Sequence, residues 1–211
     1  MTLFDLLLIL VVLGTGATVV AAAIALAVRR WAAARRLGWA VVLVWTVYLG
    51  VGTFAAAVTA QRVMAIGQDR CFDEMCFAVT GFQRVPSVGP PGKATQAGGV
   101  FVIVDVRMSN RSQRHAQREA GRKGVLLDSS GRVYEVSLPG AQALATLDGP
   151  LPGLDARVDP GQSLATRLVF DVPADAHPAF ALASGLAFNP ARIVIGDEDH
   201  FLHKRTIVPL D

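Results

Sequence analysis

Four arginines between two long apolar runs constrain this chain more than any other feature. The apolar runs cover residues 3–28 and 37–60 and contain a single charge, Asp5. Each run exceeds the roughly 20 residues that an α-helix needs to cross the hydrocarbon core of a bilayer. Between the runs lie Arg29, Arg30, Arg35 and Arg36. The pattern predicts a transmembrane helical hairpin over residues 1–60 with a basic turn at residues 29–36.

The position of the basic residues also predicts the orientation of the hairpin. A cleavable signal peptide carries basic residues ahead of its apolar stretch, whereas here they follow it. Two buried helices of a soluble domain are the other interpretation, but little else in the chain could cover helices that are apolar on all sides. Under the positive-inside rule the turn lies in the cytoplasm. We therefore expect a multi-pass protein of the cytoplasmic membrane with its N- and C-termini outside.

The overall basicity of the chain is concentrated in that turn. The net charge is +3 and the pI is near 9.2. Four of the 20 Lys and Arg residues and one of the 17 Asp and Glu residues precede residue 61, which leaves sixteen of each in the remainder. A neutral domain has no overall electrostatic footprint for nucleic acid. The expected partner is therefore the lipid bilayer and not a nucleic acid.

The remainder of the chain has the pattern of a β-sandwich. We expect a linker at residues 61–74 and an extracytoplasmic domain at residues 75–211. The strongest strand pattern covers residues 100–108, where Val and Met on one face alternate with a face that turns from apolar to polar. Further strands are expected at residues 77–85, 124–128, 132–136, 164–172, 186–195 and 201–208. Turn signals separate them, including the stretch at 86–99, and such spacing is typical of an antiparallel sandwich. Residues 141–147 are expected to form one helical turn or a bulging loop.

Cys71 and Cys76 are the only thiols in the chain. In an oxidising compartment they are expected to close a small disulfide loop, worth about 2 kcal/mol by loop-entropy arithmetic. A pair of free packed thiols and a redox-active pair are the alternatives, although the Cys-x-x-Cys spacing of redox motifs is absent. The spacing is not that of a zinc site, and no second Cys/His pair completes four ligands. No metal site is expected.

A run of basic side chains follows Asn110. Its members are Arg111, Arg114, Arg118, Arg122 and Lys123. One interpretation is a patch for an anionic or protein partner, such as lipid headgroups or an acidic polymer. The other is a solvated loop between strands, because charge runs usually face water.

Small residues recur in both apolar runs. Gly14, Thr18 and Ala22 lie four apart in the first, and Gly50 and Thr53 lie in the second. Small residues at this spacing let helices approach closely in lipid. We expect them to pack the two helices of the hairpin together. Homodimerisation and docking onto another membrane protein are the alternatives.

Three stretches of the outer part carry a family resemblance. They are residues 99–110 (GVFVIVDVRMSN), residues 126–134 (LLDSSGRVY), and Pro160-Gly161-Gln162 with residues 168–173 (LVFDVP). They resemble a bacterial family of extracytoplasmic immunoglobulin-like domains, mostly of unknown function, that stand behind a lipid anchor or a transmembrane helix. The resemblance covers about residues 77–209 and implies an immunoglobulin-like β-sandwich. The helical hairpin and the cysteine pair depart from the commoner single-anchor layout, and the family shares no catalytic residues.

The sequence contains no recognisable catalytic motif. It has no nucleophile elbow, phosphate-binding loop or dinucleotide fingerprint. His200 and His203 lie beside three acidic residues, but positions i and i+3 of a strand point to opposite faces, so an acidic turn is the simpler interpretation. We expect no enzyme and no cofactor, and predict a membrane-anchored binding or accessory module for another envelope or membrane protein. A ligand sensor that signals through a partner and a metal-dependent enzyme at residues 197–203 are the alternatives.

Overall fold

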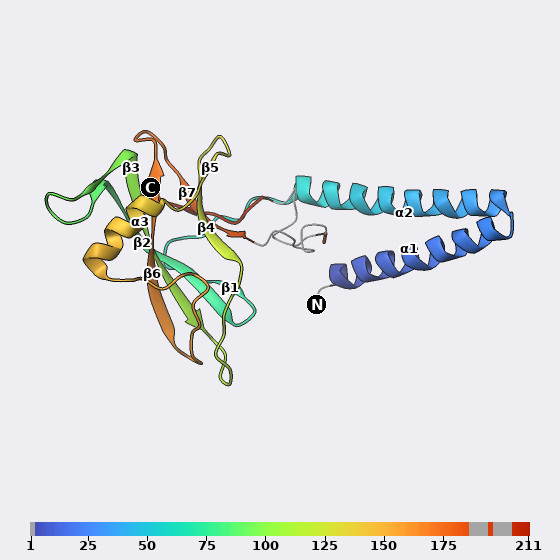
Figure 1. The fold of residues 1–211 in the computed structure, drawn as a ribbon, viewed down its shortest axis with the longest axis horizontal. Helices are drawn as coiled ribbons and strands as arrows, with labels where there is room; N and C mark the ends of the chain where they lie inside the picture. Colours follow the sequence, from blue (N-terminus) through green and yellow to red (C-terminus); the bar gives the residue numbers. More distant parts are fainter. Residues whose placement is uncertain (1–2, 186–193, 196–203) are drawn as a thin grey trace. The chain divides into compact units, whose positions relative to one another are not determined.

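The structure is a computed structural model that describes residues 3–185, 194–195 and 204–211. These residues fall into two compact units, which are described separately. One unit contains two long helices, and the other contains two β-sheets with a short helix (Figure 1).

The helical unit consists of α1 (Leu3–Ala27) and α2 (Trp31–Val58). Both are long and apolar enough to cross a membrane, by length and composition. The connection between them is shorter than expected, because α2 already begins at Trp31 and includes Arg35 and Arg36. Three alanines at residues 32–34 favour the helix there, so that nothing interrupts it before the second pair of arginines.

The small residues of the two helices differ in how far they are buried. Gly14 and Gly50 are exposed and face open space. The buried positions of α2 are Ala34, Tyr48, Gly52 and Ala56. Trp45 joins the helices, because its Nε1 donates a hydrogen bond to Thr15 Oγ1 at 3.0 Å. Of the small residues expected to pack the hairpin, Thr18 and Ala22 are partly buried, whereas Gly14, Gly50 and Thr53 are exposed, and their role in packing stays a prediction.

The second unit is an antiparallel β-sandwich, as predicted. One sheet has the order β1-β2-β3-β6 and the other has the order β5-β4-β7-β8, with every neighbouring pair antiparallel. The first sheet is built from β1 (Arg70–Phe72), β2 (Met75–Val88), β3 (Thr95–Asn110) and β6 (Ser163–Val172). The second is built from β4 (Arg122–Leu127), β5 (Val133–Tyr134), β7 (Ala179–Ser184) and β8 (Val208–Pro209).

Strand β3 supplies side chains to two cores. One face of the strand places Val102, Val104, Val106 and Met108 in the main core between the sheets. The other face places Phe101 and Ile103 in a second, smaller core. Helix α3 (Leu138–Asp148) packs against this core (Figure 1). On this face of β3 the side chains turn from apolar to polar where the cover by α3 ends and the strand becomes accessible to solvent.

Helix α3 (Leu138–Asp148) is longer than the single turn or loop expected at residues 141–147. Ser137 caps its first turn by accepting a hydrogen bond from the Gly140 N–H, and Pro139 lies in the first turn, where proline is tolerated. Gly140 also lets the helix approach the sheet, because a Cβ there would lie 2.7 Å from Val169 Cγ1. The capping signals are visible in the sequence, but the helix is stabilised mainly by the second core.

Several predicted boundaries require correction. The expected linker at residues 61–74 belongs to the sandwich, since it contains β1 and a bridge between Val63 and Ile207. The stretch at 86–99 is mostly the ends of β2 and β3, because main-chain pairing continues beyond the apolar pattern. Strand β7 was not predicted, and its alanine-rich sequence has weak strand propensity. The strand expected at residues 186–195 lies largely outside the described residues, and so does the first part of 201–208.

Candidate functional site

The predicted disulfide between Cys71 and Cys76 is present and closes the hairpin of β1 and β2. The two residues are direct cross-strand partners, with Cα atoms 3.9 Å apart. Cys76 is fully buried, whereas Cys71 is exposed. Beside them, Phe72 packs under the guanidinium of Arg122, whose Cζ lies 3.9 Å from the ring centroid. Because Arg122 belongs to β4, this hairpin connects the two sheets at one end of the sandwich.

Removing the disulfide is expected to destabilise the sandwich by about 2 kcal/mol, since the closed loop is short. The variant carrying Cys71→Ser and Cys76→Ser should unfold thermally several degrees below the oxidised protein, as measured by the β-sheet signal in circular dichroism. The oxidised protein treated with a reductant is the matched control and should behave like the variant. Identical melting of the oxidised and reduced protein would show that the crosslink contributes nothing.

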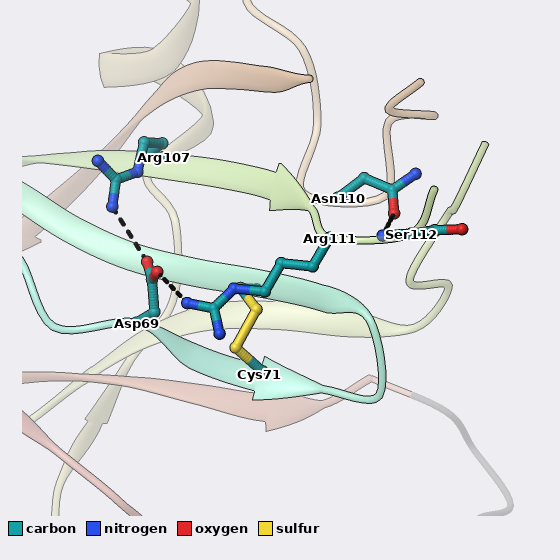
Figure 2. The surroundings of a disulfide bond; sticks show 7 residues. Asp69, Cys71, Arg107, Asn110, Arg111 and Ser112 are labelled. Carbon is teal, nitrogen blue, oxygen red and sulfur yellow. Dashed lines mark hydrogen bonds and ion pairs between the residues drawn. A yellow bond between two sulfur atoms is a disulfide. The ribbon is translucent and has the colours of Figure 1, made fainter. Parts of the chain in front are cut away.

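Asp69 connects the disulfide hairpin to the neighbouring strand. Figure 2 shows its carboxylate between two guanidinium groups: Arg107 Nη2 donates at 3.1 Å and Arg111 Nη2 at 2.7 Å. Burial raises the pKa of the Asp69 carboxyl, but the hydrogen bonds and charges of the two arginines outweigh burial and hold that pKa below its usual value. Sequence analysis missed Asp69, which lies in the expected linker.

Asn110 holds the loop that follows β3. Its side chain is 2% exposed. The amide nitrogen donates to the carbonyl oxygens of His115 and Val158, both at 2.9 Å. The amide oxygen accepts from the Ser112 N–H at 2.8 Å (Figure 2). The amide therefore connects its own loop, through His115 and Ser112, to the distant segment at Val158. The strand-terminal Asn of the resembled family therefore has a structural role here.

The five residues of the predicted basic patch do not form a run of free cations. Arg111 pairs with Asp69, Arg118 with Asp155 at 2.6 Å, and Arg122 with Glu119 at 3.2 Å. Arg114 and Lys123 are exposed and make no ion pair with the residues that the structure describes. Pairing thus offsets three of the five charges, and the use of this surface by a partner stays a prediction.

The Asp-x-x-Gly-x-x-Tyr stretch forms the turn between β4 and β5. The Asp128 carboxylate accepts hydrogen bonds from Ser130 N and Oγ, Arg132 N and the Tyr134 hydroxyl. The Ser130 hydroxyl is the largest cause that lowers the pKa of Asp128, which falls to about 2 although desolvation opposes the change. Gly131 has φ 81°, which favours glycine. This motif therefore stabilises a turn, and the Asp128 carboxylate makes its hydrogen bonds within that turn.

A hollow of about 400 Å³ lies beside this turn, at the start of the sandwich. It is lined by Gln61, by the turn, by residues 177–179 and by the end of the chain at residues 207–211. His177 is exposed at its margin. A second space, between the sheets beside Met64 and Phe180, holds about 20 Å³, which suffices for about one water molecule. Of these two spaces, the hollow is the better candidate for a ligand.

The catalytic alternatives gain no residues from the structure. Across the described parts of the chain, no three His, Cys, Asp or Glu side chains gather as a metal site would require. The metal-dependent alternative concerns residues 197–203, and all of these lie outside the described residues. It stays untested.

Comparison with known proteins places the sandwich in a family. The family described as a domain of unknown function (DUF4352) matches residues 64–190, beginning ahead of Phe77, where the resemblance was expected to begin. None of the curated proteins matches the sequence.

Solved structures with a similar fold come from several bacteria. A conserved hypothetical protein from Bacillus anthracis is 14% identical with a TM-score of 0.47, and the alignment covers 56% of this chain and 88% of that one. An uncharacterised β-sandwich protein from Clostridium difficile is 13% identical with a TM-score of 0.43, covering 72% and 96%. The secreted protein MPT63 from Mycobacterium tuberculosis is also 13% identical with a TM-score of 0.43, covering 61% and 93%.

Proposed function

This chain belongs to the DUF4352 family of domains of unknown function, and we propose that it is a membrane-anchored module that binds another envelope or membrane protein. In this proposal α1 and α2 cross the cytoplasmic membrane and the β-sandwich stands on its outer side. The four arginines around the interhelical connection support that orientation, because basic connections are retained in the cytoplasm. The disulfide supports an oxidising compartment for the sandwich.

The short connection between the helices and the sandwich carries the proposal. Helix α2 ends at Val58, and the sandwich begins its hydrogen bonds at Gln61, whose Nε2 donates to the Arg205 carbonyl oxygen at 3.0 Å. Only Thr59 and Ala60 lie between these points, and so short a chain spans on the order of 10 Å when extended. A sandwich on this tether can reach partners in or next to the same membrane, and not distant ones.

Crosslinking in intact membranes tests the proposal. A photoactivatable side chain can replace residues on two surfaces: Leu138, which is 71% exposed on α3, and Arg114 in the loop after β3. We expect a product with one other protein from at least one of these positions, and none from the matched exposed position Lys93. Recovery of self-products alone, or of no product, would contradict the proposal.

A ligand sensor is the second candidate, and the hollow lined by Gln61 favours it. A small molecule bound there would contact the residue that begins the sandwich, three positions after the end of α2. The interhelical connection carries no effector domain, so a partner would have to transmit the signal. A ligand that raises the melting temperature of the purified full chain without any protein partner would favour the sensor.

A further inference from the structure

The two ends of the sandwich sequence meet at the tether. The Met64 N–H donates to the Ile207 carbonyl oxygen at 2.9 Å, and the Ile207 N–H donates to the Arg62 carbonyl oxygen at 3.0 Å. Val63 and Ile207 form a parallel bridge, and Gln61 bonds the Arg205 carbonyl. These contacts bring the main chain at Arg62 and at Arg205, which are far apart in the sequence, side by side. They use only main-chain atoms of the two arginines.

The edge at which the two ends meet combines exposed cations with exposed apolar side chains. Val63 is 59% exposed and Ile66 is 42% exposed, whereas Met64 between them is 2% exposed and lies in the main core. Arg62 and Arg205 are exposed, and among the described residues neither has a carboxylate within ion-pair distance.

The position of this edge, directly after α2 in the sequence, limits the partners that it can contact. Arg62 follows the end of α2 at Val58 by four residues, so it cannot lie far from the surface of a membrane that α2 crosses. Guanidinium groups bind phosphate through paired hydrogen bonds, and arginine is retained beside apolar side chains at membrane interfaces. Valine and isoleucine next to them would remove apolar area from water in the headgroup layer.

We propose that this edge, defined by Arg62, Val63, Ile66 and Arg205 and called the basic edge, binds the anionic headgroups of the bilayer that anchors the chain. The two arginines contact lipid phosphates, and Val63 and Ile66 enter the boundary between headgroups and acyl chains. The contact fixes the sandwich against the membrane surface. It rests on the part of the proposed function in which α2 crosses a membrane, but not on the side that the sandwich occupies or on a protein partner, so headgroup contact and partner binding can fail separately.

Full-length protein in lipid nanodiscs allows a direct test. A fluorescent probe is attached at Val63→Cys or, as the matched exposed control, at Leu138→Cys, and quenching by lipids with a spin-labelled headgroup is measured. Nanodiscs of phosphatidylcholine alone are compared with nanodiscs containing about one third phosphatidylglycerol. We expect quenching at position 63 to exceed that at position 138, and the difference to grow with anionic lipid and shrink with salt. Equal quenching at both positions would overturn the proposal.

Charge variants test the arginines. Truncating the pair with Arg62→Ala and Arg205→Ala leaves the main-chain hydrogen bonds intact, so the fold should persist. We expect the equilibrium constant for headgroup contact to fall about fivefold per arginine in anionic nanodiscs. The control variant Lys93→Ala with Arg114→Ala removes the same charge elsewhere and should leave quenching unchanged. Equal behaviour of the two double variants, or contact that is insensitive to lipid charge, would contradict headgroup binding.

Discussion

Replacing Asn110 by leucine is expected to lower the free energy of unfolding of the sandwich by on the order of 3 kcal/mol. The leucine fills a similar volume but leaves the His115 and Val158 carbonyl oxygens and the Ser112 N–H without their present partners. Each buried polar group that loses its hydrogen bond contributes about 1–3 kcal/mol of destabilisation. Denaturant unfolding of the purified full chain, followed by circular dichroism, measures the change.

The neighbouring residue Gln113 provides the control for this prediction. Its side chain is exposed, and we expect Gln113→Ala to change stability by less than about 0.5 kcal/mol. If Asn110→Leu were as mild as this control, the loop after β3 would not depend on the buried amide. The explanation of the strand-terminal Asn would then be wrong.

Removing the positive charges beside the interhelical connection is expected to have the largest effect on the protein as a whole. With Arg29, Arg30, Arg35 and Arg36 all replaced by glutamine, the basic residues nearest the helices would be those on the sandwich side, beginning with Arg62, and they would favour the inverted orientation. We expect a mixed population in which a large share of molecules have the sandwich in the cytoplasm. A membrane-impermeant thiol reagent, applied to intact cells carrying Asp211→Cys, measures that share.

Replacing the same four residues by lysine separates charge from side-chain shape. The positive-inside rule depends on charge, so the lysine variant should keep the orientation of the natural protein. Loss of orientation in both variants would indicate that arginine is needed for another reason. An unchanged glutamine variant would show that the sandwich sets the orientation.

The parts of the fold that sequence reasoning recovered are those with a strong local period. Residues 100–108 alternate over their full length, and the strand they predict lies inside β3 with its Val and Met side chains in the main core. The two apolar runs likewise became α1 and α2. In both cases a continuous pattern in the side chains reflects one environment along the whole element.

The parts that were missed depend on contacts between distant segments. Helix α3 is held by the second core, to which β3 and β6 contribute, and its own sequence shows little more than its caps. Strand β1 pairs with β2 through only three residues, in a stretch that is mostly polar. Strand β8 and the bridge at Val63 bring together the two ends of the sandwich sequence. No pattern in the local sequence predicts such pairings.

The same distinction applies to the candidate sites. The resembled motifs contain Asn110 and Asp128, but the hydrogen bonds of both side chains stabilise loops. Asp69 and the basic edge were not predicted, because each becomes recognisable only when segments far apart in the chain are placed side by side. Spacing along the sequence could show the arginines but not which carboxylates they meet.

Cysteine labelling of the natural orientation tests the central claim most directly. Single substitutions Ala32→Cys, in the connection region, and Asp211→Cys, at the end of the chain, are introduced while the disulfide between Cys71 and Cys76 is kept. An impermeant maleimide added to intact cells is expected to label position 211 and to reach position 32 only after the membrane is permeabilised. Labelling of position 32 without position 211 would contradict an extracytoplasmic sandwich on a cytoplasmic arginine turn.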